Sequence, residues 1–341
     1  MNKKYKIILL CVGITILAYL VYDFGINNII INLQKTGWYF IPVIGVWAFV
    51  YLFNIFAWQF IIGNENKIPF HKISAITISG FAINYLTPSI AIGGEPYRIA
   101  ELKESLGTNK AVSATLLYAM IHNLSSFVFW MIVIILAFVS LQLTLATKIS
   151  LIIIFIIFSA VVYLFLTLHK KGVVKSLLSI ILKIPILKKL ATPLLRKADL
   201  LQQIDDRITE LYLNRRKNFY SALSCEIIAR IIASLENLFI LKAIGINISF
   251  LEALYINAFS TFIVTIFFFM PMELGSREGG LALVLKTLGI SSSLGVYLGL
   301  VNRIRQLFWI LIGLMLVGLS GKKLNKKLII NGADYEKSNI V

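Results

Sequence analysis

Two interrupted apolar stretches decide the fold of this 341-residue chain. The first, within residues 73–100, contains Pro88-Ser-Ile-Ala-Ile-Gly-Gly-Glu-Pro-Tyr-Arg98, and the second, within residues 254–288, contains Pro271-Met-Glu-Leu-Gly-Ser-Arg-Glu-Gly-Gly-Leu281. Proline removes a backbone donor and breaks a helix. In lipid, a broken helix is tolerated only where protein or water satisfies the freed groups. Each stretch therefore predicts a re-entrant hairpin or a discontinuous helix pair, with two ordinary kinked spans as the alternative.

The composition places these stretches in a membrane. Hydrophobic residues make up 58% of the chain, charged residues only 14%, and the mean hydropathy is +0.85. These values exclude a soluble enzyme, a disordered chain and a fibrous protein. We predict an all-α, polytopic helical membrane protein with two re-entrant hairpins. Its six transmembrane helices are expected at residues 7–22, 38–62, 112–141, 149–168, 219–241 and 294–319.

The domain organisation follows from this pattern. Residues 1–320 are expected to form one transmembrane domain, and residues 321–341 a short basic cytoplasmic tail. Between the fourth and fifth spans, the insert 169–218 is basic and repeats apolar residues at helical spacing. It predicts an amphipathic helix on the cytoplasmic membrane surface, or equally a solvated structural face. The pair Gly295-x-x-x-Gly299 predicts a close approach of two helices.

An internal repeat is indicated by two segments that align without gaps. Tyr118 to Trp130 matches Tyr297 to Trp309 at an offset of 179 residues, and each segment follows an interrupted stretch. Repeat one covers about residues 38–141 and repeat two about residues 219–320.

The charges predict the orientation of the repeats. If both hairpins return to the side they entered from, 22 of the 33 Lys and Arg residues fall on one side, which is cytoplasmic by the positive-inside rule. The two halves then have opposite topology, as in secondary transporters.

Several polar residues fall inside predicted spans, where a charge costs about 2.5 kcal/mol or more. Glu226 and Arg230 are four residues apart and predict a local ion pair, which either locks packing or serves function. His122 is read as an interior histidine, with a proton relay as the weaker alternative. The other polar residues of these spans include Asn123, Asn302, Arg303 and Arg305. At least one of the last two arginines is expected to contact Glu278, Glu236 or a ligand.

The two breaks carry charged residues beside exposed backbone. The first has Gly94, Glu95 and Arg98, and the second has Arg277 and Glu278. Helix N-termini and arginine both suit phosphate, so the breaks predict a site for an anionic or zwitterionic lipid headgroup. In the alternative interpretation, Glu95 with Arg98 and Arg277 with Glu278 neutralise each other and hold the loops.

Motifs for catalysis are absent from the sequence. It contains no phosphate-binding loop, no His-x-x-x-His, no Gly-x-Ser-x-Gly and no Asp-rich metal motif. We therefore expect no enzymatic activity, no cofactor, no metal and no nucleic-acid partner.

A resemblance to a known family is carried by Asn84-Tyr-Leu-Thr-Pro88, Gly94-Glu95-x-x-Arg98, Pro271 and Gly275-x-x-Glu278. Over roughly residues 5–320, the chain is similar to the flippase-like family, the membrane region of lysylphosphatidylglycerol synthases. This resemblance implies movement of modified phospholipids or glycolipids between leaflets, and it adds Asn84, Pro88, Pro271 and Gly275 to the expected substrate site. The soluble synthase domain of those enzymes is not expected here, so aminoacyl-lipid synthesis is not expected either.

The resulting hypothesis is a multi-pass protein of the cell (inner) membrane, with both termini cytoplasmic, that binds or translocates a polar phospholipid or glycolipid. One alternative is a non-catalytic membrane partner of a glycosyltransferase or lipid-synthesis enzyme, and a homo-oligomer is a further expectation about partners. The other alternative is a small-solute or ion transporter.

Overall fold

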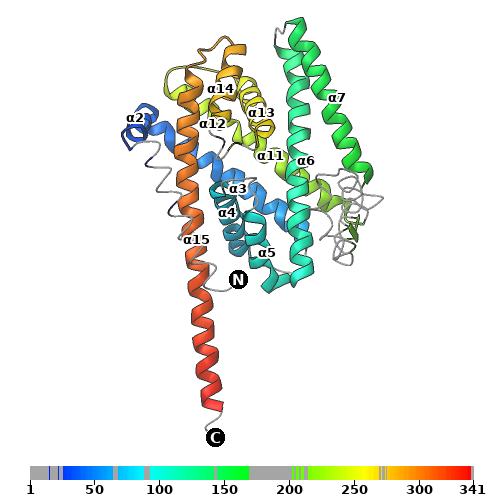
Figure 1. Ribbon diagram of the computed structural model, residues 1–341, viewed down its shortest axis with the longest axis vertical. Coiled ribbons are helices and arrows are strands. Elements are labelled where there is room, and N and C mark those ends of the chain that lie inside the picture. Colours follow the sequence, from blue (N-terminus) through cyan, green and yellow to red (C-terminus); the bar gives the residue numbers. More distant parts are fainter. Residues whose placement is uncertain are drawn as a thin grey trace.

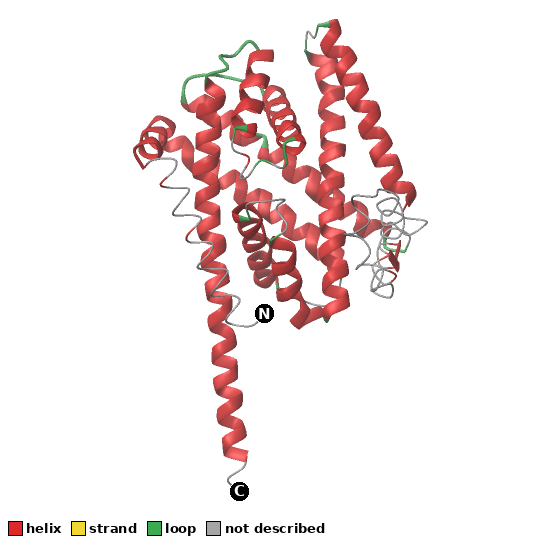
Figure 2. Cartoon of the chain, viewed as in Figure 1, coloured by secondary structure: helices red, strands yellow, loops and turns green. Residues whose placement is uncertain are grey.

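The computed structural model describes a helical membrane protein. It covers residues 26–63, 68–87, 93–141, 144–168 and 214–338, except 269, 271, 272 and 274, together with a few isolated positions. Side chains are described as far as residue 319, apart from those of residues 28 and 29. Within these ranges all regular structure is helical (Figure 2). The predicted all-α class is confirmed.

Four helical segments are long and apolar enough to cross a membrane. They are Ile30–Ile62, Thr108–Ser140, Leu145–Thr167 and Leu294–Leu319. The first comprises part of α2 (Ile26–Thr36), the 3-10 turn η1 (Gly37–Tyr39) and α3 (Phe40–Ile62), and the others belong to α6 (Thr108–Ser140), α7 (Leu145–Leu168) and α15 (Leu294–Ser338). The predicted second, third, fourth and sixth spans are thus confirmed, although the second begins eight residues earlier than predicted, at Ile30. The predicted first span lies outside the described residues, apart from two isolated positions.

Each interrupted stretch is a pair of short helices. The first pair is α4 (Phe70–Leu86) and α5 (Gly94–Leu106), and the second is α13 (Phe250–Ile266) and α14 (Ser276–Thr287). None reaches the roughly 20 residues that a straight span needs. A positive φ at Gly107 and at Gly289 follows α5 and α14, and it allows the chain to turn into the next long helix. The predicted interruption of each stretch into two helices is confirmed.

The two hairpins approach the centre of the molecule from opposite ends. In Figure 1, α4 and α5 lie in the lower half, whereas α13 and α14 lie in the upper half. Helix α5 runs from its break to the lower end of α6, and α14 runs from its break to the upper end of α15. Both breaks therefore face the middle of the molecule.

Each long helix also packs against the hairpin of the other half. The hydroxyl of Ser79 on α4 donates to the carbonyl of Gly313 on α15 at 2.9 Å. The indole of Trp130 on α6 donates to Thr261 on α13 at 3.2 Å. Between the two hairpins, α3 and α11 (Arg216–Ala233) lie side by side and cross the molecule obliquely (Figure 1). The hairpins are thus held by helices distant in sequence.

The predicted fifth span is wrong as one continuous helix. It divides into α11 and α12 (Leu235–Ala243), with Ser234 between them. The amide of Asn257 on α13 donates to the carbonyl of Arg230 at 3.1 Å and to the Ser234 hydroxyl at 3.0 Å. The N–H of Ser234 bonds to Ile231, three residues back. An inserted side chain of this kind interrupts the helical ladder.

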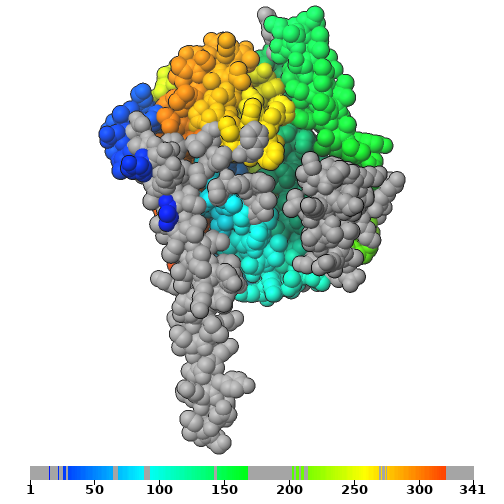
Figure 3. Space-filling view, viewed as in Figure 1, coloured from blue at the N-terminus to red at the C-terminus, as the bar shows by residue number. Residues whose placement is uncertain are grey.

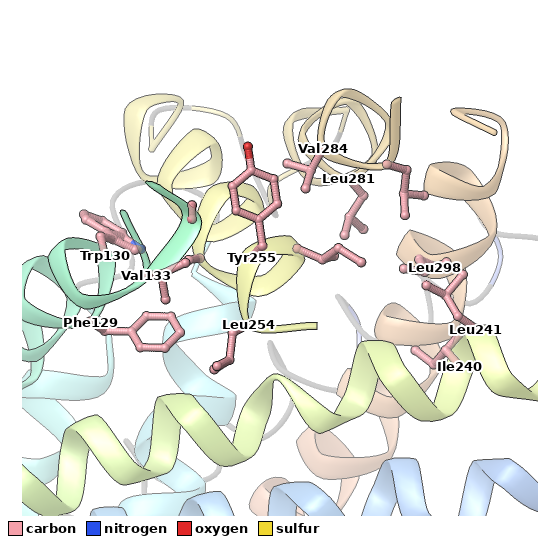
Figure 4. Packing of buried hydrophobic residues seen from close by; sticks show 14 of the residues in the cluster. Phe129, Trp130, Val133, Ile240, Leu241, Leu254, Tyr255, Leu281, Val284 and Leu298 are labelled. Atoms are coloured by element: carbon pink, nitrogen blue, oxygen red, sulfur yellow. The ribbon is translucent and has the colours of Figure 1, made fainter. Parts of the chain in front are cut away.

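The largest hydrophobic cluster joins α6 to the second hairpin. Figure 4 shows Phe129, Trp130 and Val133 of α6 approaching Leu254 and Tyr255 of α13, with other members of the cluster on α12, α14 and α15. Helix α7 contributes Leu151 and Phe158 to this cluster, but only 11% of its apolar window is buried. Figure 3 shows it as the green ridge on one side of the molecule. Its apolar side chains are suited to contact with lipid.

Some predicted features lie outside the described residues. They are Pro88, Pro271 and most of the insert 169–218. Beyond the sixth span, α15 continues to Ser338, so the predicted tail 321–341 is largely helical in its backbone.

A glycine pair sets the distance between α14 and α15, as its spacing predicted. A Cβ on Gly295 would lie 2.4 Å from the backbone nitrogen of Ala282, and one on Gly299 would lie 2.8 Å from Cγ of Glu278. By contrast, a Cβ on Gly45 of α3 would meet nothing within 4 Å.

We predict that Gly295→Ala lowers the melting temperature of the detergent-purified protein, because the backbone of α14 must move away. Gly45→Ala is the matched control and should melt at or above the wild-type temperature, since alanine favours helix by about 1 kcal/mol. Equal melting temperatures for the two variants would contradict the close approach.

Candidate functional site between the two hairpins

The first break is organised by Asn84 at the end of α4. Its side-chain oxygen accepts the backbone N–H of Gly94 at 2.6 Å, and its amide donates to Glu95 at 3.2 Å. A Cβ on Gly94 would lie 2.3 Å from the carbonyl oxygen of Gly80, so α5 begins where only glycine fits. Asn84 therefore ties the start of α5 to the end of α4.

Arg98 is directed into the protein. Its Nη1 donates to Glu95 at 3.0 Å, and its guanidinium lies 4.7 Å from the ring centroid of Phe81 and 5.4 Å from that of Tyr118. The side chain is 2% exposed, whereas Glu95 is 24% exposed. The mutual neutralisation of Glu95 and Arg98 is present. One carboxylate oxygen of Glu95 bonds to Asn84 and Arg98, and the other is buried without a partner among the described residues.

The second break pairs its charges differently from the prediction. Arg277 donates from Nε to Glu273 at 2.8 Å and forms an ion pair with the same carboxylate. The predicted Arg277–Glu278 pairing is wrong, because adjacent residues on a helix point in different directions and Glu278 bonds to Arg303 instead. Glu273 has a φ of +58°, which is uncommon for a residue other than glycine. Such backbone strain often occurs at functional sites.

Glu278 pairs with Arg303 of α15 instead. The two side chains form two hydrogen bonds, at 2.6 Å and 3.1 Å, and Glu278 also accepts the backbone N–H of Gly275 at 3.0 Å. This ion pair confirms the expected contact of an α15 arginine with Glu278. It fixes the turn of the second hairpin to α15.

Arg303 also joins the two breaks. Its Nη1 lies 3.5 Å from the hydroxyl of Tyr85, in the last turn of α4 before the first break. Its Nη2 donates to the backbone carbonyl of Glu273 at 3.3 Å. Tyr85 and Glu273 were not among the predicted site residues. Spacing could not have identified either one, because Glu273 lies before the start of α14 and Tyr85 is set by tertiary packing.

Arg305 lies in a second buried cluster. It forms a bidentate ion pair with Glu236 of α12, with both hydrogen bonds at 2.9 Å. Trp47 of α3 donates to the same carboxylate at 2.7 Å, and the guanidinium lies 3.8 Å from its ring centroid. The predicted contact with Glu236 is thus confirmed. Asn302, one turn earlier on α15, is buried, and its side-chain oxygen has no partner among the described residues.

Glu226 forms the third polar cluster, and its predicted ion pair with Arg230 is wrong. Its carboxylate accepts the amide of Asn54 at 3.0 Å and lies 2.7 Å from Nδ1 of His122. Arg230 instead donates to the Ser125 hydroxyl at 2.8 Å and to the carbonyl of His122 at 2.7 Å. Tertiary partners on α3 and α6 have replaced the local pair.

The structure thus distributes the predicted residues over three clusters. The break cluster contains Asn84, Gly94, Glu95, Arg98, Gly275, Arg277, Glu278 and Arg303, although Arg98 is buried behind Glu95. Asn302 and Arg305 lie apart on α15, and Glu226 and Arg230 lie at α11. Asn123 is exposed, and its amide donates to Ala119 on its own helix, so it joins none of them. In the described part of the chain, no group of three His, Cys, Asp or Glu side chains could hold a metal ion.

We predict that Arg305→Ala destabilises the protein strongly, because it leaves the buried Glu236 unpaired. Removing one partner of such a pair costs about 3–5 kcal/mol. Arg305→Gln combined with Glu236→Gln should be milder, since neither side chain then carries a charge. The measurement is the melting temperature in detergent, with the exposed Arg216→Ala as control. A single variant as stable as wild type would show that the pair contributes little.

Comparison with known proteins bears on the identity of this fold. The family model of the lysylphosphatidylglycerol synthase TM region matches residues 6–313, a range that includes both hairpins, three of the four confirmed spans, most of the last one and all three polar clusters. Searches of curated proteins and of solved structures give no match. The match confirms the resemblance carried by the two breaks. The chain therefore belongs to the family of the lysylphosphatidylglycerol synthase TM region, which marks it as a lipid-related membrane protein.

Proposed function

We propose that this protein binds a polar lipid and moves it between the two leaflets of the cell membrane, without covalent chemistry. The observation that carries the proposal is the position of Arg303, which bonds Glu278 of one break and lies against Tyr85 of the other. The two breaks bring polar groups to one place in an otherwise apolar bilayer. A headgroup that crosses a membrane needs such a place, while its tails stay in the lipid.

The exposed charges of the break cluster suit a headgroup with both signs. Arg277 is 18% exposed, Glu278 is 19% exposed and Glu273 is 33% exposed. The planar fork of arginine can bind phosphate through two hydrogen bonds, and the carboxylates can receive a cationic group. Arg277 is the better phosphate ligand of the two predicted arginines, because Arg98 is almost completely buried.

We further propose that the two halves form an inverted repeat. The support is the reciprocal packing, in which α15 lies against the first hairpin and α6 against the second. Helices α6 and α15 run in opposite directions, and each follows a hairpin in sequence (Figure 1). In transporters of this architecture, the substrate site lies where the repeats meet.

The proposed orientation places both termini and the loop between α5 and α6 in the cytoplasm. We predict that Asn109→Cys, at the start of α6, is labelled by an impermeant maleimide only after permeabilisation. Ser292→Cys, between α14 and α15, should be labelled in intact cells. Both positions are exposed. Asn109 comes directly after the first hairpin and Ser292 after the second, and the proposed orientation puts them on opposite sides of the membrane. The reversed labelling pattern would show that the protein has the opposite orientation in the membrane. Equal labelling of the two positions would contradict the proposal that the hairpins enter from opposite sides.

The transport proposal predicts that Arg277→Ala lowers translocation of a fluorescent phosphatidylglycerol in liposomes about tenfold or more. This is the effect of losing one charge-assisted hydrogen bond of about 1.5–3 kcal/mol. Arg277→Lys should restore only part of the rate, because lysine lacks the bidentate fork. Arg216→Ala, at the exposed start of α11, is the matched control. Each melting temperature is measured on the same preparation, and full translocation by a stable Arg277→Ala protein would refute the role.

A further inference from the structure

The pair formed by His122 and Glu226 is not explained by the break cluster. Glu226 is completely buried, whereas the side chain of His122 is 33% exposed. Their contact of 2.7 Å therefore connects a carboxylate without access to solvent with an imidazole that has access. Among the described residues, no hydrogen bond is made to Nε2, the second ring nitrogen of His122.

The depth of His122 makes this exposure significant. His122 lies near the middle of the 33-residue α6, and this helix is long enough to span a bilayer. A polar ring exposed to hydrocarbon at that depth is costly, so its open edge should face water or a ligand. Phe81 of α4 lies 5.7 Å from the imidazole between ring centroids. The imidazole therefore lies beside the first hairpin.

The charges around the pair permit one added proton. Because a carboxylate only accepts hydrogen bonds, Nδ1 of His122 donates to Glu226 and Nε2 is a free acceptor when the ring is neutral. Protonation of Nε2 makes the ring cationic, and Glu226 then neutralises it at contact distance. Arg230 donates to the Ser125 hydroxyl and the His122 carbonyl and not to Glu226, but its positive charge lies close enough to interact with the Glu226 carboxylate.

The other helices around His122 and Glu226 contribute both uncharged and charged groups. Helix α3 contributes the uncharged amide of Asn54, and α4 contributes an aromatic ring. Helices α7 and α13 also pack against α6, but each carries a single charged residue, in its first turn: Lys148 and Glu252. The other titratable groups near the pair are Tyr118 on α6, Cys225 on α11, and Arg98 of α5, which is paired with Glu95.

We propose that His122 and Glu226 form a proton-binding site that couples proton movement to passage of the lipid headgroup; this inference rests on the proposed function. A proton that enters at Nε2 changes the open edge from an acceptor to a cationic donor. The edge then attracts a phosphate group only in its protonated state. One proton thus accompanies each anionic headgroup, and the proton gradient supplies the direction of transport.

The experiment measures the steady-state distribution of fluorescent phosphatidylglycerol between leaflets. The purified full chain is placed in vesicles of phosphatidylethanolamine and phosphatidylglycerol, with the membrane potential clamped and a pH gradient of one unit. Coupling to one proton predicts a shift of up to about tenfold in the leaflet ratio, because one pH unit corresponds to a factor of ten. The ratio does not depend on the rate, so slow variants can still be compared.

His122→Gln and Glu226→Gln should abolish the shift in the leaflet ratio, because glutamine does not titrate. Glutamine can still donate or accept a hydrogen bond. His71→Gln, at the exposed start of α4, is the matched control and should respond like wild type. An equal shift in wild type and His122→Gln would overturn the coupling.

A second measurement separates this inference from the proposed function. The chain has three histidines, so imidazole resonances can be assigned from His→Gln variants and titrated by NMR. A pKa of His122 that differs between wild type and Glu226→Gln supports the proton site, even in a variant that transports poorly. An identical pKa in both proteins overturns the site. If the lipid does not move in wild type at all, the proposed function fails and the coupling fails with it, while the titration still decides the proton site.

Discussion

The ion pair between Arg303 and Glu278 is the interaction on which the centre of the molecule depends. A charged group within a bilayer must be paired, and this pair satisfies two such groups at once. Glu278 also closes the turn before α14 through Gly275, while Arg303 reaches the carbonyl of Glu273 and the hydroxyl of Tyr85. The turn of one hairpin, the long helix α15 and the end of the other hairpin are therefore held by one guanidinium.

The same requirement explains why the interior polar groups link helices that are distant in sequence. Arg305 joins α15 to α12 and lies over a tryptophan of α3, and Glu226 joins α11 to α3 and α6. A hairpin that changes position must exchange these partners for others of equal strength, because an unpaired buried charge costs several kcal/mol. Movement in such a protein is thus restricted to arrangements in which every buried charge keeps a partner.

Sequence patterns predicted the parts of this structure that depend on local chemistry. Proline and glycine located both breaks, the length of apolar runs located four spans, and the spacing of Gly295 and Gly299 predicted the contact of α15 with α14. The partners of Glu226 and Arg277 could not be found in this way. The nearby Arg230 could pair with the carboxylate of Glu226, but side chains from two other helices bond to it instead. The division of the fifth span likewise depends on Asn257, which is far away in sequence.

The packing of α4 against α15 constrains the order in which the protein can be completed during synthesis. Ala82 and Leu86 of α4 are covered by Ile310 and Leu314, and the hydroxyl of Ser79 bonds to the Gly313 carbonyl. A helix that leaves the ribosome about two hundred residues after the first hairpin therefore supplies its cover. Until α15 is inserted, α4 presents small and polar side chains to lipid, and the nascent hairpin has no complete structure of its own. A chain interrupted before α15 would thus leave its earliest hairpin unfinished, although all residues of that hairpin had long been made.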